Sequence, residues 1–304
     1  MKINSFTQTI ARVVALSAFT AGSALAGSAP APAGKGITIP ANPTDWLDHT
    51  IAPVTNPIYF EDAVIRNEIR PIYLHHNIDN GFVTQGGSVD VWALQARFAL
   101  TDRLALIATK DGYISLDPGA GESQTGWADV ALGLKYAVID DRANSFLLTP
   151  GFTFEIPLGN RDVFQGNGDG QFDVFVSTQK GFGDLHISAN AGFLLPLDGG
   201  EESTSFHYSV MVDYYLHQYF IPFVSLNGFT VVDGGSTLPI DSEGFDLINF
   251  GSSKADGVNQ MALGFGFRSR LMKNLDLGVA WEMGIGSPKG LYEDRLTVDF
   301  CLRF

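Results

Sequence analysis

The last ten residues of the chain alternate regularly between apolar and polar side chains. The apolar set is Leu296, Val298, Phe300, Leu302 and Phe304. The polar set is Arg295, Thr297, Asp299, Cys301 and Arg303. Successive side chains of a β-strand point to opposite faces, whereas a helix would spread both sets around its circumference. The pattern therefore predicts a strand with one apolar face and one polar face.

The same period of two recurs backward along the chain from this last strand. It predicts twelve strands, at 68–77, 88–100, 103–115, 126–139, 145–157, 171–181, 184–196, 204–217, 219–232, 258–271, 274–286 and 291–304. An even number of antiparallel strands is the rule for single-chain bacterial outer-membrane barrels. We therefore expect an all-β fold, a transmembrane, antiparallel, up-and-down β-barrel of about twelve strands.

The predicted connections alternate in length. Short turns fall near 101–102, 140–144, 181–183, 218 and 273, and longer connections fall at 78–87, 116–125, 158–170, 197–203 and 233–257. Outer-membrane barrels have short periplasmic turns and longer external loops. We therefore predict that the N- and C-termini are periplasmic and that the long, acidic loops are external.

A soluble β-sandwich or a lipocalin-like barrel is the alternative, because it would show the same alternation with the faces reversed. Three features favour the membrane version: Gly and Ala occupy polar-side positions such as Gly264, Gly278 and Ala280, the opposite face is large and apolar, and the chain ends on Phe304. Charged residues make up only 17% of the chain, which is low for a water-exposed surface. No apolar run approaches the roughly 18 residues of a transmembrane helix.

The N-terminal region predicts export. Residues 1–26 resemble a signal peptide, with Lys2 and Arg12, a short apolar core and a small-residue cleavage site at 24–26. Residues 27–66 form either a periplasmic leader or a segment that enters and plugs the lumen, and residues 67–304 form the barrel. A formal net charge of −14 argues against a nucleic-acid partner. Cys301 is the single cysteine, so no internal disulfide is expected.

Three segments resemble known outer-membrane proteins. The ending LTVDFCLRF resembles the C-terminal signature that the outer-membrane assembly machinery reads. Residues 126–136 (GWADVALGLKY) are similar to a G-x-x-D-x-x-L-G-x-K-Y strand of the barrels named for the MetA pathway of phenol degradation, and residues 152–159 resemble their next strand. Ala137 departs from that pattern, in which Arg follows the Tyr. The resemblance implies a barrel that moves small, often hydrophobic or aromatic molecules.

The predicted inner face carries both signs of charge. The positive residues are Arg66, Arg70, Arg97, Lys135, Arg268, Arg270, Arg295 and Arg303. The negative residues are Glu68, Asp111, Asp129, Glu155, Asp173, Asp213, Asp276, Glu282 and Asp299. Such residues line a pore that orients a solute, or they brace a narrow barrel through salt bridges. The near balance of charge favours the brace.

Candidate catalytic and metal-binding residues are few. Two His-x-Ser pairs, His186 with Ser188 and His207 with Ser209, have the spacing of outer-membrane lipid hydrolases, but we predict that both point inward. A Gly-rich stretch at 166–170 lacks the spaced acids of a calcium loop. We predict no enzyme, no cofactor and no metal.

The sequence favours passive passage of a small solute across the bacterial outer membrane, and the resemblance implies that such a solute is often hydrophobic or aromatic. One alternative is a structural or surface-interaction barrel without transport, and a second is a barrel hydrolase. The expected partners are outer-membrane lipid and lipopolysaccharide, the assembly machinery acting on the C-terminal strand, and the solute.

Overall fold

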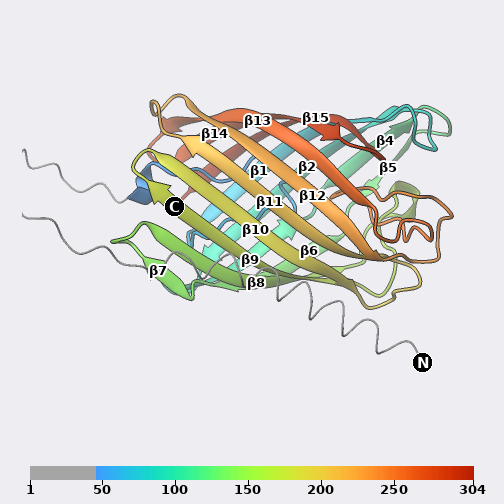
Figure 1. Ribbon diagram of the computed structural model, residues 1–304, viewed down its shortest axis with the longest axis horizontal. Helices are drawn as coiled ribbons and strands as arrows, with labels where there is room; N and C mark the ends of the chain where they lie inside the picture. Colours follow the sequence, from blue (N-terminus) through green and yellow to red (C-terminus); the bar gives the residue numbers. More distant parts are fainter. Residues whose placement is uncertain (1–45) are drawn as a thin grey trace, which may run out of the picture. The chain divides into compact units, whose positions relative to one another are not determined.

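The computed structural model describes residues 46–304, so the predicted signal peptide and residues 27–45 lie outside the described part. The described chain forms one closed antiparallel sheet (Figure 1). Strand β1 pairs with β2 on one side and with β15 on the other, and this second pairing closes the barrel. Within residues 46–304 the strands occupy twelve positions around the barrel, as the alternation predicts.

The segments follow one another in chain order, with short 3₁₀ helices η1 at Trp46–Asp48 and η2 at Arg161–Val163. The strands are β1 (Glu68–Ile78), β2 (Gly87–Ala99), β3 (Leu104–Lys110), β4 (Tyr113–Pro118), β5 (Gln124–Trp127), β6 (Val130–Tyr136), β7 (Ile139–Asp141), β8 (Phe146–Ile156), β9 (Gln171–Phe182), β10 (Leu185–Pro196), β11 (Thr204–Tyr214), β12 (Ile221–Asp233), β13 (Asn259–Met272), β14 (Leu275–Ile285) and β15 (Tyr292–Arg303).

Two predicted strands are interrupted in the structure. The predicted strand 103–115 is divided into β3 and β4 at Asp111 and Gly112, and 126–139 is divided at Ala128 and Asp129 into β5 and β6, with the short β7 beyond. Gly112 has a φ of +127°, a value that an L-residue rarely adopts. The prediction of continuous strands is wrong here. Buried positions are odd-numbered before the first break, as at Ile107, and even-numbered after it, as at Ile114, so no single alternation runs through residues 103–115.

The outer face of the barrel is apolar. Large hydrophobic side chains stand exposed at every second position, as a lipid-facing surface requires. They include Trp92, Phe98, Leu106, Leu132, Phe152, Val174, Val210, Val224, Phe265, Trp281 and Phe300. Among the described residues there is no helix with the length and apolarity needed to cross a membrane.

The first strand of the barrel begins at the same end of the barrel at which the last strand ends. Glu68 of β1 is paired with Arg303 of β15, and the Phe304 amide donates to the Asn67 carbonyl. The short connections lie at this end, such as 183–184 and 273–274, and the long ones, such as 157–170 and 234–258, lie at the other. Which end faces the periplasm remains a prediction.

The segment before β1 runs through the interior of the barrel. Between Thr50 and Val64 every residue except Ile58 is buried, although the chain there forms no strand. We call residues 49–66 the plug. Its backbone is not paired in a sheet, so its polar groups need other partners, which include side chains of the barrel wall.

The long connection 234–258 also folds inward. Residues 242–248 within it are buried, and Asp246 is only 1% exposed. The prediction that the acids of the long connections are exposed is therefore wrong for Glu243 and Asp246, whereas acids such as Asp117 and Glu122 are exposed. The physical reason is that Asp246 meets the buried guanidinium of Arg295.

Candidate functional site: the barrel interior

The structure places nearly all of the predicted lumen-lining residues inside the barrel. Arg70, Arg97, Asp129, Lys135, Glu155, Asp173, Asp213, Arg268, Asp276, Glu282, Arg295 and Asp299 are buried. Arg270 and Arg303 lie at the rim, with side chains 16% and 27% exposed. Both contact Asp276. The prediction that Asp111 faces inward is wrong, because Asp111 lies at the strand break among exposed residues of the outer face.

A carboxylate held by two guanidinium groups fixes the start of the plug. Asp299 on β15 accepts hydrogen bonds from Arg70 Nε at 2.6 Å and from Arg268 Nη1 at 2.7 Å. The same two arginines donate onward to the plug: Arg70 Nη2 to the Pro53 carbonyl at 2.6 Å and Arg268 Nε to the Ala52 carbonyl at 2.7 Å. The wall charges therefore also satisfy plug backbone that has no sheet partner.

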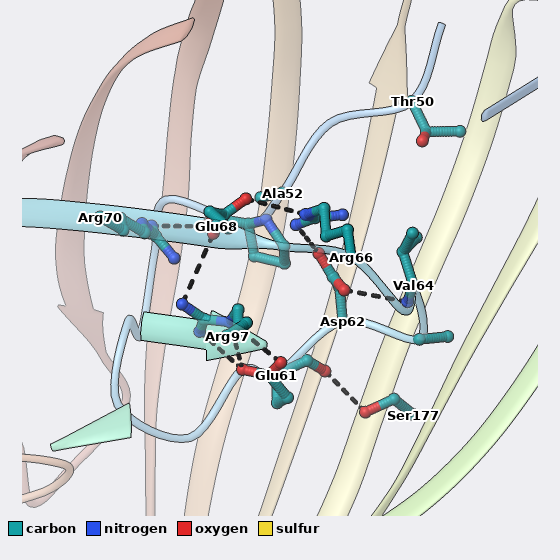
Figure 2. A network of polar contacts seen from close by, with 12 residues as sticks. Thr50, Ala52, Glu61, Asp62, Val64, Arg66, Glu68, Arg70, Arg97 and Ser177 are labelled. Carbon is teal, nitrogen blue, oxygen red and sulfur yellow. Dashed lines mark hydrogen bonds and ion pairs between the residues drawn. The ribbon is translucent and has the colours of Figure 1, made fainter. Parts of the chain in front are cut away.

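A second cluster fixes the end of the plug (Figure 2). Glu61 accepts from Arg97 Nη2 and from Lys135 Nζ, each at 2.6 Å. Lys135 also contacts the Asp62 carboxylate at 3.3 Å, and Asp62 forms an ion pair with Arg66. Charged groups in a low-dielectric interior are stable only when they are paired and hydrogen-bonded, and the plug supplies the acids that Arg97 and Lys135 require.

Two further ion pairs lie nearer the long connections. Arg295 on β15 binds Asp246, with Nη1 at 2.7 Å, and Glu282 lies 4.0 Å from the same guanidinium. Lys110 Nζ donates to Glu155 at 2.6 Å. Asp129 instead accepts the backbone amides of Gly159 and Gly166 at 2.8 and 2.9 Å. Arg295 and Glu155 therefore each have an ion-pair partner inside the barrel, and the bracing role of these charges stays a prediction.

The wall formed by β9, β10, β11 and β12 is different, because its inner face is mostly uncharged. Here Thr55 of the plug meets Ser225 at 2.8 Å, and Asn56 donates to Ser209 at 3.0 Å. Ser177 donates to the Glu61 carbonyl at 2.6 Å. These are single hydrogen bonds between neutral groups. The plug is thus held by ion pairs on one side and by neutral hydrogen bonds on the other.

The two His-x-Ser pairs lie on this mostly uncharged wall and point inward. His186 Nδ1 is 2.7 Å from Asp213, and His207 Nε2 is 2.8 Å from Asp173. Within the described residues, Ser188 Oγ and His186 Nε2 have no hydrogen-bond partner, so the histidine does not activate the serine. Both residues are at most 1% exposed. A lipid substrate at the outer face would not reach them.

The interior becomes apolar toward the long connections. A buried cluster there joins the wall, η2 and the connection 234–258, and contains Leu74, Ile78, Phe82, Val89, Val91, Ile114, Leu116, Ala128, Val163, Leu247, Ile248, Phe250 and Leu291. A cavity of about 260 Å³ opens beside it. The Phe250 ring lies 5.7 Å from the Phe82 ring and 5.4 Å from the Phe164 ring, and all three line the cavity.

Sequence reasoning missed several partners of the wall charges. Glu61 and Asp62 lie in the plug, Asp246 lies in a connection, and Lys110 ends β3 just before the break. One signal was present: Glu61 and Asp62 stand in an otherwise apolar, Pro-rich segment directly before the barrel. The pairings themselves join residues up to 74 positions apart, and a single sequence does not reveal them.

No metal site is evident in residues 46–304, since no group of three or more His, Cys, Asp or Glu residues there is placed to hold an ion. Sequence comparisons add little: no family profile matches the chain, and no curated protein matches it.

Comparison with solved structures is informative about the fold. An outer membrane channel from Pseudomonas putida F1, of the group COG4313, superposes with a TM-score of 0.59 at 15% identity, covering 84% of this chain and all of that one. The NanC porin gives a TM-score of 0.50 at 8% identity, covering 78% of this chain and 100% of the porin. The chain therefore has the fold of bacterial outer-membrane β-barrels.

Proposed function

We propose that the protein is an outer-membrane channel for passive passage of a small apolar or aromatic solute. The observation that carries this proposal is the apolar cavity of about 260 Å³ at the end with the long connections, bordered by the rings of Phe82, Phe164 and Phe250. Ligand pockets of this kind are concave and mainly apolar, with a few polar groups for orientation. The channel and porin folds of the structural neighbours support the proposal that the protein is a channel.

The charges of the interior support passage of an uncharged solute better than that of an ion. Asp299 is shared by two arginines, and Glu61 is shared by Arg97 and Lys135. Charges that neutralise one another in pairs give little selectivity for free ions. The plug occupies the lumen, so passage along the barrel axis requires the plug to move or the solute to leave by another route.

The experiment is uptake of the aromatic probe N-phenyl-1-naphthylamine by intact cells that make the protein. Phe250→Asn places an amide in the apolar cavity and should slow uptake markedly, because the cavity then disfavours an aromatic ring. The matched control is Leu197→Asn, since Leu197 is 58% exposed on a neighbouring long connection. Probe uptake no faster than in cells without the protein would refute an apolar-solute channel and favour a barrel without transport.

A further inference from the structure

A second, smaller cavity lies beside the apolar cavity, at the end of the barrel with the long connections. It has a volume of about 20 Å³, which is close to the space that one water molecule requires, and an ammonium group is of similar size. Within residues 46–304, Lys110 is the one basic residue that lines it. We call it the acidic cavity, because its lining combines acids with aromatic rings, among them Asp129, Glu155, Glu202, Tyr59, Phe164 and Phe245.

Most acids around the acidic cavity already have hydrogen-bond donors. These donors are Lys110 for Glu155, two backbone amides for Asp129, the Phe250 and Ser252 amides for Glu243, and Arg295 for Asp246. Glu202 differs, because its Oε2 has no hydrogen-bond partner within the described residues although the residue is only 6% exposed. A buried polar atom without a partner is costly, so this oxygen is available to a donor that a ligand supplies.

A glycine makes room for the Glu202 carboxylate. A Cβ built on Gly168 would lie 2.5 Å from Glu202 Oε2, and Gly168 has a φ of +62°. The Gly168 amide donates to the carboxylate of Glu201 at 2.9 Å rather than to Glu202. The glycine-rich stretch 166–170 therefore covers Glu202 Oε2 without giving it a hydrogen bond.

The charges around Glu202 favour a cationic donor over a neutral one. Lys110 supplies one positive charge to the acidic cavity, whereas Asp129, Glu155 and Glu202 supply three negative charges when all are ionised. An excess of negative charge in a low-dielectric site attracts a positive group. In the described part of the chain no three acids or histidines are placed to hold a metal ion, so an organic ammonium group fits this cavity better than a metal does.

Aromatic side chains extend the site toward the apolar cavity. Tyr59 and Phe245 line the acidic cavity, and the faces of such rings attract ammonium groups. Phe164 and Ile248 line both the acidic cavity and the apolar cavity. Phe164 has a φ of +56°, a value that bulky L-residues rarely adopt and that is concentrated at functional sites. A ligand that carries both a ring and an ammonium group can therefore reach both cavities past Phe164.

We propose that the solute is a primary arylalkylamine, whose ring binds in the apolar cavity and whose ammonium group binds to Glu202. This inference rests on the proposed passage of aromatic solutes and specifies their chemical class. An alkylammonium group is protonated at pH 7, because its pKa is close to that of lysine, about 10.4. The ammonium group donates to Glu202 Oε2, and Phe164 separates it from the ring.

Binding of such a cation should release a proton from Glu202. Burial raises the pKa of Glu202 from 4.5 to about 8, and Glu155 contributes to the rise while Lys110 opposes it. Asp129 and Glu201 raise this pKa further. Without a bound amine Glu202 is therefore mostly protonated at pH 7, and a bound ammonium group favours its ionised form. The other titratable groups that line the cavity are Tyr59, Glu243 and Asp246.

The test is isothermal titration calorimetry of the protein in detergent at pH 7. The ligands are 2-phenylethylamine and 2-phenylethanol, which share the ring and the chain and differ in charge. Wild type should bind the amine about tenfold or more tightly than the alcohol, because hydrogen bonds between charged groups are stronger than neutral ones. Glu202→Gln should lose this preference and keep its affinity for the alcohol. The matched control is Glu201→Gln, since that side chain is 46% exposed, and it should retain the preference.

Titrations in buffers of different ionisation enthalpy count the protons that amine binding releases. We expect about one proton for the wild type and for Glu201→Gln, and none for Glu202→Gln. Equal affinity of the wild type for amine and alcohol, or equal proton release by the wild type and Glu202→Gln, would overturn the amine site. Absence of proton release by the wild type would also overturn it, and this measurement and the wild-type affinities do not depend on the folding of any variant.

Uptake of N-phenyl-1-naphthylamine separates failure of this inference from failure of the proposed function. If the amine site is overturned while cells that make the protein take up the probe faster than cells without it, the channel for aromatic solutes stands and only the solute class is wrong. Probe uptake at the level of cells without the protein would refute both.

Discussion

Two parts of the barrel wall hold the same plug by different means. The charged arc, formed by the inner faces of β13, β14, β15, β1 and β2, holds it through groups such as Arg268, Arg70 and Arg97. The neutral arc, formed by β9 to β12, holds it through Ser177, Ser209 and other uncharged side chains. Each arc satisfies plug backbone or side chains that lack a sheet partner. Departure of the plug takes Glu61 away from Arg97 of the charged arc and from Lys135 of β6, whereas the contacts of the neutral arc to the plug involve no charged side chain.

This difference assigns separate roles to the two arcs. Breaking a buried ion pair is costly, because the remaining charge then lies without a partner in a low-dielectric environment. Neutral hydrogen bonds are easily exchanged for bonds to water, so their net contribution is small. We therefore expect the charged arc to fix the position of the plug, and the neutral arc to be the side along which water or solute first passes.

The largest expected effect is loss of the carboxylate shared by Arg70 and Arg268. Asp299→Asn leaves two buried guanidinium groups without a negative partner, and breaking a buried ion pair in this way costs about 3–5 kcal/mol. The control on the neutral arc is Ser225→Ala, which removes one hydroxyl contact to Thr55 and should cost about 0.5–1.5 kcal/mol. The free energy of unfolding in urea measures both. Equal losses would abolish the distinction between the arcs.

A smaller effect is expected on the occupancy of the plugged state. Glu61→Gln removes the charge that Arg97 and Lys135 share, and hydrogen bonds to charged groups contribute about 1.5–3 kcal/mol. Because about 1.4 kcal/mol corresponds to a tenfold change in an equilibrium, single-channel recordings should show open states more than about tenfold more often.

The matched control for Glu61→Gln is Ser177→Ala. It removes a neutral hydrogen bond to the backbone carbonyl of the same plug residue, and a contribution near 1 kcal/mol predicts a rise of less than about tenfold. A larger rise for Ser177→Ala than for Glu61→Gln would show that the neutral arc, and not the charged arc, positions the plug.

The barrel was predictable from the sequence because its alternation is local. Residues 295–304 reveal a strand with two faces, and the same rule places Arg268, Asp299 and most other wall charges inside. The break at Asp111 and Gly112 was not predicted from the alternation, since residues 109–112 carry no apolar side chain from which a change of phase could be recognised. The partners Glu61 and Asp246 were not predictable either, because irregular segments carry no period and their positions are set by tertiary contacts.

The stability of the connection 197–203, at the end of the neutral arc that carries the long connections, should depend on pH. Glu202, in the connection 197–203, has its pKa raised from 4.5 to about 8, first by burial and then by Glu155 and the other nearby acids Asp129 and Glu201, against the opposing effect of Lys110. Because the folded-state pKa is the higher one, this residue's contribution to stability is fully present below about 4.5 and is lost as the pH rises through about 8.

We therefore expect the connection 197–203 to become more sensitive to protease between pH 7 and pH 9, the interval that contains the Glu202 pKa of about 8. Glu202→Gln removes the titrating group and should abolish the increase, while Glu201→Gln, a more exposed neighbour, should retain it. An identical pH profile for the Glu202→Gln protein would assign the titration to another group.

The last comparison is between one buried glutamine from each arc, and the smaller effect is expected on the neutral arc. Within the described structure Gln179 on β9 makes no side-chain hydrogen bond, whereas Gln95 on β2 donates to Pro57 and Thr109. Gln95→Leu should therefore cost about 1–3 kcal/mol, because it leaves buried carbonyl groups unpaired, and Gln179→Leu should be neutral or slightly stabilising. Urea unfolding measures both variants. Destabilisation by Gln179→Leu equal to that by Gln95→Leu would mean that Gln179 binds ordered water or solute, and the neutral arc would then hold its polar contents as firmly as the charged arc holds the plug.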